Sequence, residues 1–172
     1  MKINGRTLKR RLFGLTTLPS RVARVRFFRG HGVHSPFVYN IVRQVFMRNT
    51  LLDEDTTIFA MLQSQSVAKR PAMHLQNLYT HCSYRTFALN ALTTPCDLCI
   101  VTEQSDEQTT LDLARRAAMQ GTTFALMEPY NGRERAALCH RLVEEHPCTS
   151  VDKGSYLLLF THPNLPKQAY RL

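Results

Sequence analysis

The stretch Asp97-Leu-Cys-Ile-Val-Thr-Glu103 is a short apolar run that begins and ends on an acidic residue. A second apolar run, Thr122–Glu128, also ends on an acidic residue. It follows Glu107–Gln120, in which apolar residues recur at helical spacing as far as Gly121. Continuous apolar runs are typical of strands buried on both faces, and an intervening helix lets two such strands pair in parallel. The sequence therefore predicts an α/β fold with two central parallel strands.

The C-terminal part extends this pattern. Asn131 and Glu134 resemble a capping box at the start of a further helix. Thr149–Val151 and Tyr156–Phe160 flank an Asp-Lys-Gly sequence that is typical of a hairpin turn. We therefore expect a mostly parallel sheet of about four or five strands with an antiparallel C-terminal hairpin.

Upstream of Asp97, the residue pattern predicts a strand over Met73–Tyr79 and a short helix over Tyr84–Leu92. We expect the first of these segments to pair with the strand at Asp97. Asp53–Asp55 are interpreted as the start of a short helix that buries Ile58, Phe59 and Leu62 and stops before Pro71.

A longer helix is expected before these elements. Ser35 is a favourable N-cap residue, and Pro36 follows it at the first helical position. Apolar residues then recur at helical period through Val45. The sequence predicts a helix from Ser35 to about Met47, packed on the sheet by its apolar face.

The positive charge is concentrated at the N-terminus. Residues 1–52 contain eleven Lys and Arg and no acidic residue, whereas residues 53–172 contain the other eleven and all thirteen acidic residues. A basic arm over residues 1–30 fits an anionic partner such as nucleic acid, an acidic surface or anionic lipid. A solvated arm that aids solubility, or one that packs on the following domain, is the alternative.

Composition narrows the protein class. The chain has 172 residues, of which 44% are hydrophobic and 20% charged, as expected for a globular domain. It contains no apolar run of about 20 residues and no signal-peptide pattern, so we expect no transmembrane segment. The five cysteines are interpreted as reduced thiols in a cytoplasmic protein. Cys96 and Cys99 are expected to be buried structural thiols rather than zinc ligands.

The stretch Arg29-Gly-His-Gly-Val-His-Ser-Pro-Phe-Val-Tyr39 resembles the N-terminal signature of a known family. That family comprises class I S-adenosylmethionine-dependent methyltransferase-like proteins, found mainly in Bacteroidetes-type bacteria. Asp97–Glu103 resembles the family's fourth strand, Phe124–Pro129 its fifth, and residues 151–168 its C-terminal hairpin and tail. The resemblance implies a helical signature segment over residues 31–70 and a Rossmann-like methyltransferase domain over residues 71–172.

The chain departs from the family pattern where the cofactor should bind. A glycine-rich turn after the first strand and an acidic residue after the second normally hold S-adenosylmethionine. Between Asp55 and Asp97, where both strands belong, there is neither a glycine nor an acidic residue, and the segment is short. We therefore expect a reduced fold that binds no cofactor, unless the family activity survives with S-adenosylmethionine at a rebuilt site.

Four residues are candidates for catalytic chemistry. Glu103 and Glu128 follow adjacent predicted strands and are expected at the carboxyl edge of the sheet, where they could share a proton or hold a cation. His31 and His34 could reach the same edge as general bases. The alternatives are solvated strand-end acids and histidines that fix a loop. The remaining histidines, His74, His81, His140, His146 and His162, lack metal-ligand spacing and are predicted at the surface.

Three function classes follow from these observations. The first is a degenerate, non-catalytic methyltransferase-like protein that binds or assembles with a partner. The second is an active methyltransferase with a rebuilt cofactor site. The third is a basic module that binds nucleic acid or an anionic surface through residues 1–30. The first class explains both the matching blocks and the missing ones.

Overall fold

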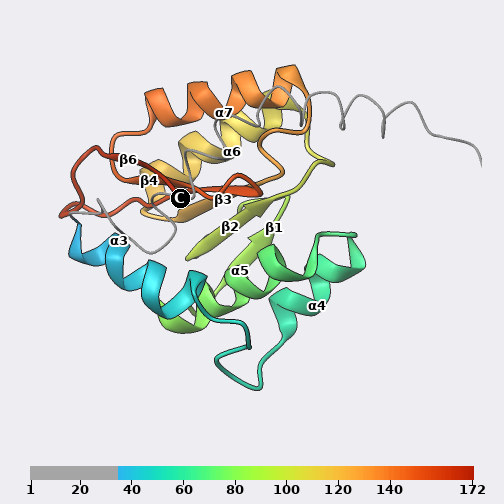
Figure 1. Cartoon of the computed structure of the whole chain (residues 1–172). Helices are drawn as coiled ribbons and strands as arrows, with labels where there is room; N and C mark the ends of the chain where they lie inside the picture. The colour runs from blue at the N-terminus through green and yellow to red at the C-terminus, as the bar shows by residue number, and fades with distance from the viewer. Residues whose placement is uncertain (1–34) are drawn as a thin grey trace, which may run out of the picture.

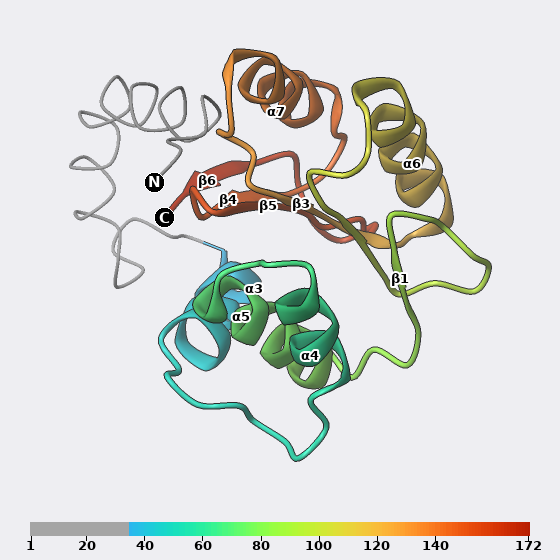
Figure 2. The same ribbon diagram turned by 90° about the vertical axis from the view of Figure 1, so that its right-hand side faces the viewer.

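The computed structural model describes residues 35–172. The central layer of the fold is a β-sheet formed by strands between residues 87 and 171. Helices cover both faces of this sheet, α6 and α7 on one side and α3, α4 and α5 on the other (Figures 1 and 2). The predicted arm at residues 1–30 lies outside the described residues. The strands are β1 (Phe87–Leu89), β2 (Leu98–Val101), β3 (Thr123–Met127), β4 (Ser150–Asp152), β5 (Tyr156–Leu159) and β6 (Ala169–Arg171). The helices are α3 (Pro36–Ile41), the π-helical η1 (Val42–Phe46), α4 (Thr57–Ser64), α5 (Lys69–His81), α6 (Glu107–Gln120) and α7 (Arg133–Glu145).

The strand order is β1-β2-β3-β5-β4-β6. β1, β2 and β3 are parallel, β5 is antiparallel to both β3 and β4, and β6 is parallel to β4. All strands except β5 therefore run in the same direction. This arrangement confirms the α/β class and the mostly parallel sheet with an antiparallel hairpin, and it is consistent with a Rossmann-like fold.

The side chains of the central strands alternate between the two faces of the sheet, and this divides the core into two parts. In β2, Leu98 and Ile100 pack with α3, α4 and α5, whereas Cys99 and Val101 pack with α6 and α7. Successive side chains of a strand point to opposite faces, so a strand covered on both sides must be apolar throughout. Every residue of β2 and β3 is buried, as their continuous apolar runs predicted.

The predicted helix start at Ser35 is confirmed. The Ser35 hydroxyl oxygen accepts a hydrogen bond from the Val38 backbone N–H at 3.3 Å, and Pro36 occupies the first turn. The helix continues into η1 and is capped by Met47. Its apolar face is buried in the core against the sheet, as expected.

Two elements upstream of β2 were predicted wrongly. Met73–Tyr79 is part of helix α5, and the segment predicted as the helix Tyr84–Leu92 contains strand β1. It is β1 that pairs with β2. The short helix predicted to stop before Pro71 is present as α4, which begins at Thr57, ends at Ser64 and buries Ile58 and Leu62. Pro71 itself lies in the first turn of α5, where a missing N–H costs no intrahelical hydrogen bond.

Two further differences concern the C-terminal half. Gly132, with φ +101°, is the N-cap of α7, and no side chain caps this helix, so the capping box at Asn131 does not form. Strand β6 was not predicted, and together with β1 it brings the sheet to six strands. The hairpin itself is as expected, and the Asp152 carboxylate accepts a hydrogen bond from the Gly154 N–H at 2.7 Å within its turn.

Candidate functional site

The carboxyl edge of the sheet, where α/β proteins usually bind ligands, holds two of the sequence candidates. Glu103 follows β2 and is exposed, and Glu128 follows β3 with φ +48°, in the left-handed region. The Glu128 N–H donates to the Ser155 carbonyl oxygen at 2.8 Å, which ties this turn to the hairpin. His31 and His34 lie outside the described residues, so the structure brings together only the two glutamates.

Arg135 occupies the space between the ends of β2 and β3. Its guanidinium donates hydrogen bonds to the carbonyl oxygens of Met127, at 2.9 and 3.1 Å, and of Thr102, at 3.0 Å. Burial lowers the pKa of Arg135, whereas the charges of Glu103 and Glu128 raise it. The two glutamates therefore face a cation that is already bonded to the backbone of both strand ends.

Asn90 closes the neighbouring gap between β1 and β2. Its Oδ1 accepts from the Thr102 N–H at 2.7 Å, and its Nδ2 donates to the Thr102 Oγ1 at 2.9 Å. The Ser105 hydroxyl also donates to Asn90 Oδ1, at 3.2 Å. Asn90 has φ +53°, a conformation that Asn tolerates better than most residues. In the turn after β1, the Asn90 side chain is thus hydrogen-bonded to the residue that follows β2, and it covers the position where an open backbone would face a ligand.

The hairpin end of the same edge is also occupied. The Tyr130 hydroxyl donates to the buried carboxylate of Asp152, at the end of β4. Arg171 of β6 forms an ion pair with the same carboxylate, N to O at 3.5 Å. Burial, together with this hydrogen bond, raises the pKa of Tyr130 above its ordinary value. Tyr130 is therefore a neutral donor to Asp152 at physiological pH.

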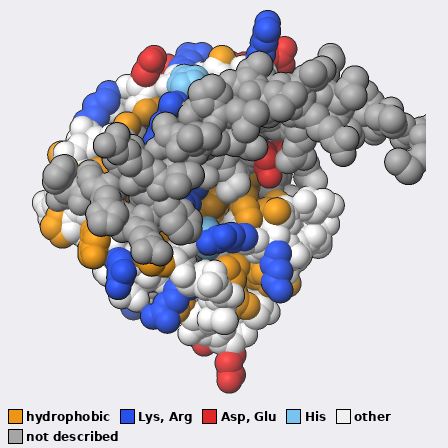
Figure 3. Space-filling view, in the orientation of Figure 1, with side chains coloured by type: hydrophobic (Ala, Val, Ile, Leu, Met, Phe, Trp, Pro, Cys, Tyr) orange, Lys and Arg blue, Asp and Glu red, His pale blue; other side chains and the backbone are white. Residues whose placement is uncertain are grey.

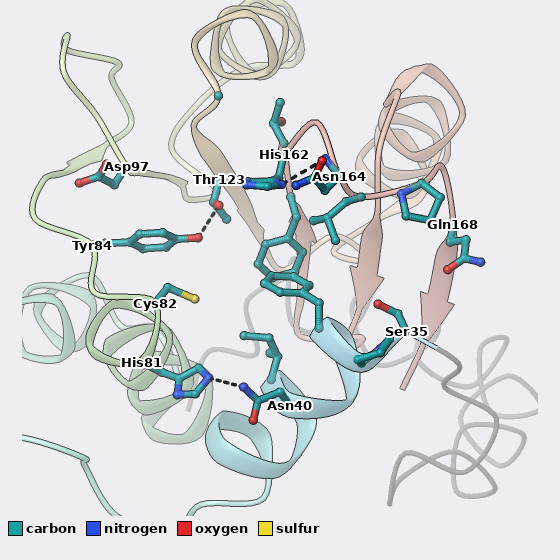
Figure 4. Close-up of a pocket in the computed structure, with 18 residues that line it drawn as sticks. Ser35, Asn40, His81, Cys82, Tyr84, Asp97, Thr123, His162, Asn164 and Gln168 are labelled. Atoms are coloured by element: carbon teal, nitrogen blue, oxygen red, sulfur yellow. Dashed lines mark hydrogen bonds between the residues drawn. The ribbon is translucent and has the colours of Figure 1, made fainter.

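A pocket of about 790 Å³ lies at the opposite edge, and we call it the amino-edge pocket. It is lined by residues within 35–41, 81–84 and 160–168, and by Asp97, Gly121 and Thr123 near the starts of β2 and β3. Asn40 and His81 lie on one side of it, and His162 and Asn164 lie across from them (Figure 4). Cavities of this size accommodate small organic molecules.

Contacts between distant segments hold the walls of the amino-edge pocket. They are the Asn40 Nδ2 to His81 Nε2 hydrogen bond at 3.3 Å, the Tyr84 Oη to Thr123 Oγ1 hydrogen bond at 2.6 Å, and the edge-to-face packing of Phe37 on Phe160 with ring centroids 5.0 Å apart. Burial raises the pKa of the Cys82 thiol and of the Tyr84 hydroxyl. Both groups are therefore neutral, and the pocket presents no activated nucleophile at Cys82.

Two histidines predicted at the surface are buried, and this prediction was wrong. His74 Nδ1 lies 3.0 Å from the Tyr156 hydroxyl, and His146 Nε2 lies 2.9 Å from the Phe160 carbonyl oxygen. Each imidazole thus has one hydrogen-bond partner inside the core, which offsets part of the cost of burying a polar ring, although His74 Nε2 is buried without a partner. The other three histidines are exposed or half-buried, as expected.

The cysteines of the C-x-x-C pair are buried, as predicted. The Cys96 and Cys99 thiols donate to the carbonyl oxygens of Leu98 and Ala91, and burial raises the pKa of Cys99 to about 12. Within residues 35–172, no group of three or more His, Cys, Asp or Glu is placed to hold a metal ion. In the same part of the chain, none of the helices is long and apolar enough to cross a membrane.

The sequence did not indicate a role for Arg135, for Asn90 or for the residues that line the pocket. Arg135 lies in the first turn of a surface helix, and Asn90 lies in a segment predicted to be helical, so neither has a distinctive spacing. The amino-edge pocket joins residues 35–41 to residues 160–168, which are far apart in the sequence, and no local pattern indicates it.

Comparisons of the chain with models of known protein families, with curated proteins and with solved structures find no match.

Proposed function

We propose that this protein is a non-catalytic relative of the S-adenosylmethionine-dependent methyltransferase-like family, with a role in binding or assembly. The blocks that resemble the family's fourth and fifth strands are neighbouring parallel strands, β2 and β3. The block that resembles the C-terminal hairpin pairs antiparallel and lies beside β3. These positions support the resemblance in order and direction.

The observation that carries the proposal is the occupied carboxyl edge. Asn90 bonds to Thr102 across the gap between β1 and β2, and Arg135 bonds to the ends of β2 and β3. A cofactor placed there would have to displace these hydrogen bonds, each worth about 1 kcal/mol net and more when a buried partner is left unsatisfied. In the described part of the chain, the turn after β1 contains no glycine, whereas a close backbone approach to the cofactor requires one.

Calorimetric titration of the full chain with S-adenosylmethionine and with its demethylated product, S-adenosylhomocysteine, tests this proposal. We expect no binding with a dissociation constant below ~50 µM, because each 1.4 kcal/mol of lost contact weakens affinity about tenfold. A tighter constant would contradict the proposal and would favour the active methyltransferase, with a cofactor site rebuilt around His31, His34, Glu103 and Glu128.

The distribution of charge supports a second candidate, an anion-binding role for the basic N-terminus. Residues 35–172 contain thirteen basic and thirteen acidic residues, so the net charge of +9 belongs to residues 1–34. On the face shown in Figure 3, the Lys and Arg side chains of the described residues are dispersed among hydrophobic, uncharged and acidic ones. An anionic partner would therefore be attracted mainly by the N-terminal residues.

Binding to duplex DNA and to vesicles with anionic lipid, each at two salt concentrations, tests this second candidate. We expect the double variant Arg21→Gln, Arg24→Gln to weaken binding and to reduce its salt dependence. The matched control is Arg43→Gln, Arg48→Gln, which removes the same charge from the described part of the chain. Equal losses for the two variants would contradict a specific role of the N-terminus.

A further inference from the structure

The charge of the amino-edge pocket restricts its ligand. None of its described lining residues is Lys or Arg, and Asp97 is its one carboxylate. Asp97 Oδ2 accepts hydrogen bonds from the Arg85 and Thr86 N–H groups at 2.8 and 2.9 Å. These bonds lower the pKa of Asp97, and the nearby charge of Arg85 lowers it further. Among the described lining residues, no Lys or Arg charge therefore compensates the desolvation of an anionic ligand.

Polar groups in the same lining offer both donors and acceptors. The Thr161 Oγ1 atom is buried and has no hydrogen-bond partner, which leaves a hydroxyl unsatisfied beside the pocket. Asn40, Asn164 and Gln168 add side-chain amides, each of which carries a carbonyl oxygen and an NH₂ group. A ligand that matches this lining has hydrogen-bond donors and acceptors of its own but no net charge.

Aromatic surface forms another part of the lining. Phe37 is half-buried and packs edge to face on the buried Phe160, so Phe37 presents part of an aromatic ring to the pocket. Aromatic ligands pair favourably with such rings in stacked or edge-to-face geometry. Pro36, which is exposed, and Leu165, which is half-buried, add aliphatic surface that suits the apolar part of a ring.

We infer that the amino-edge pocket binds an uncharged heteroaromatic molecule whose ring carries both hydrogen-bond donors and acceptors. The inference depends on the pocket alone and goes beyond the proposed loss of cofactor binding at the carboxyl edge. A ligand seated there would contact the end of α3, the end of α5 and the segment after β5. Binding would thus join elements that are distant in the sequence.

Two pairs of compounds with similar rings, one neutral and one anionic in each, test the inference on the full ¹⁵N-labelled chain. The pairs are nicotinamide with nicotinate and uracil with orotate, followed by amide chemical shifts in NMR. We expect at least one neutral compound to shift the signals of Asn40, Thr123, Thr161 and Gln168 saturably below ~10 mM, the range of weak fragments. Its anionic partner should bind at least about fivefold more weakly. No saturable shift from either neutral compound, or equal binding of the anion, would overturn the inference.

Thr161→Val tests the unsatisfied hydroxyl. The substitution removes no hydrogen bond from the free protein, so its melting temperature should be unchanged or higher. The neutral ligand should lose about threefold to tenfold in affinity, as expected for one hydrogen bond. Unchanged affinity would contradict the role given to this hydroxyl.

Asn164→Lys tests the charge argument at an exposed position on the rim. A new cation should improve the affinity of the anionic compound relative to its neutral partner. Gln104→Lys, an exposed residue at the opposite edge, is the matched control and should leave this ratio unchanged. Equal ratios in the two variants would overturn the inference.

Shifts at Asn90 and Thr102 with S-adenosylhomocysteine would instead contradict the proposed function, so the two failures are distinguishable.

Discussion

The imidazole Nδ1 of His74 on α5 lies 3.0 Å from the hydroxyl of Tyr156 on β5, and both side chains are buried. The two rings pack edge to face, with centroids 6.0 Å apart. The cations near this imidazole are Lys153, from the β4–β5 turn, and Arg70, from the start of α5. Burial, with these two charges, lowers the pKa of His74 from 6.5 to about 4.

This pKa predicts that the protein loses stability in mild acid. The unfolded chain takes up a proton at His74 near pH 6.5, whereas the folded protein takes it up only near pH 4. The contribution of His74 to the free energy of unfolding is complete above pH 6.5. It decreases by about 3 kcal/mol as the pH falls to about 4. His146 shifts in the same direction. Urea unfolding at pH 7.5, 5.5 and 4 measures the loss.

His74→Gln isolates this contribution, because Gln can still hydrogen-bond the Tyr156 hydroxyl but does not titrate. We expect a clearly shallower pH dependence in this variant than in the wild type. The matched control is His140→Gln, at an exposed position on α7, which should keep the wild-type slope. The same slope in His74→Gln and the wild type would show that His74 is not the titrating group.

Ser35→Ala should lower the free energy of unfolding by about 1 kcal/mol, because the Val38 N–H loses its side-chain acceptor. Ser35→Asn retains an N-cap acceptor and should recover most of this loss. Chemical unfolding of both variants provides the measurement. An Ala variant as stable as the wild type would mean that the cap contributes nothing to the start of α3.

Asn90→Ala should lower the free energy of unfolding by about 2–3 kcal/mol. It removes the acceptor of the Thr102 N–H, and Ala tolerates the left-handed φ of +53° less well than Asn does. Asn90→Asp keeps an acceptor oxygen and should cost clearly less at neutral pH. If both variants lose the same amount, the hydrogen bond to Thr102 does not hold β1 to β2.

Arg135→Met should lower the free energy of unfolding by about 2 kcal/mol, because the Met127 and Thr102 carbonyl oxygens lose a charged donor. Arg133→Met, two residues earlier and exposed, is the matched control and should stay within about 0.5 kcal/mol of the wild type. Equal effects of the two substitutions would contradict the bridging role of Arg135.

The parts of the fold that could be predicted are those with a strong local pattern. β2 and β3 are continuous apolar runs, and α6 has an amphipathic period and ends at Gly121 with φ +73°. Ser35 and Pro36 indicated the start of α3 by the same local chemistry. In each case the tertiary structure agrees with the local preference.

The errors arise where tertiary contacts override the local pattern. Helix α5 buries polar residues, including Gln76, whose Oε1 accepts hydrogen bonds from the Ile58 and Phe59 N–H groups of α4. Polar residues on a buried face remove the amphipathic period that would have indicated a helix. β1 has only three residues, too few for an alternating pattern, and its pairing with β2 identifies it as a strand.

Of the four candidate residues, Glu103 and Glu128 lie where the sequence predicted them, but their contacts were not predicted, and His31 and His34 lie outside the described residues. Glu103 and Glu128 do follow neighbouring strands at one edge, because parallel strands bring their carboxyl ends together. The partner that faces them, Arg135, comes from the next helix, and its reach to the Thr102 and Met127 carbonyl oxygens depends on how α7 packs. Such a contact is set by tertiary packing and has no signature in the sequence.

The most direct test of the occupied carboxyl edge is an NMR titration of the full ¹⁵N-labelled chain with S-adenosylhomocysteine. The amide signals of Asn90, Thr102, Glu103 and Glu128 report on this edge. We predict that they stay unshifted up to ~1 mM ligand, about twentyfold above the ~50 µM constant that would indicate a working cofactor site. Saturable shifts of these four signals with a constant below ~50 µM would contradict the account.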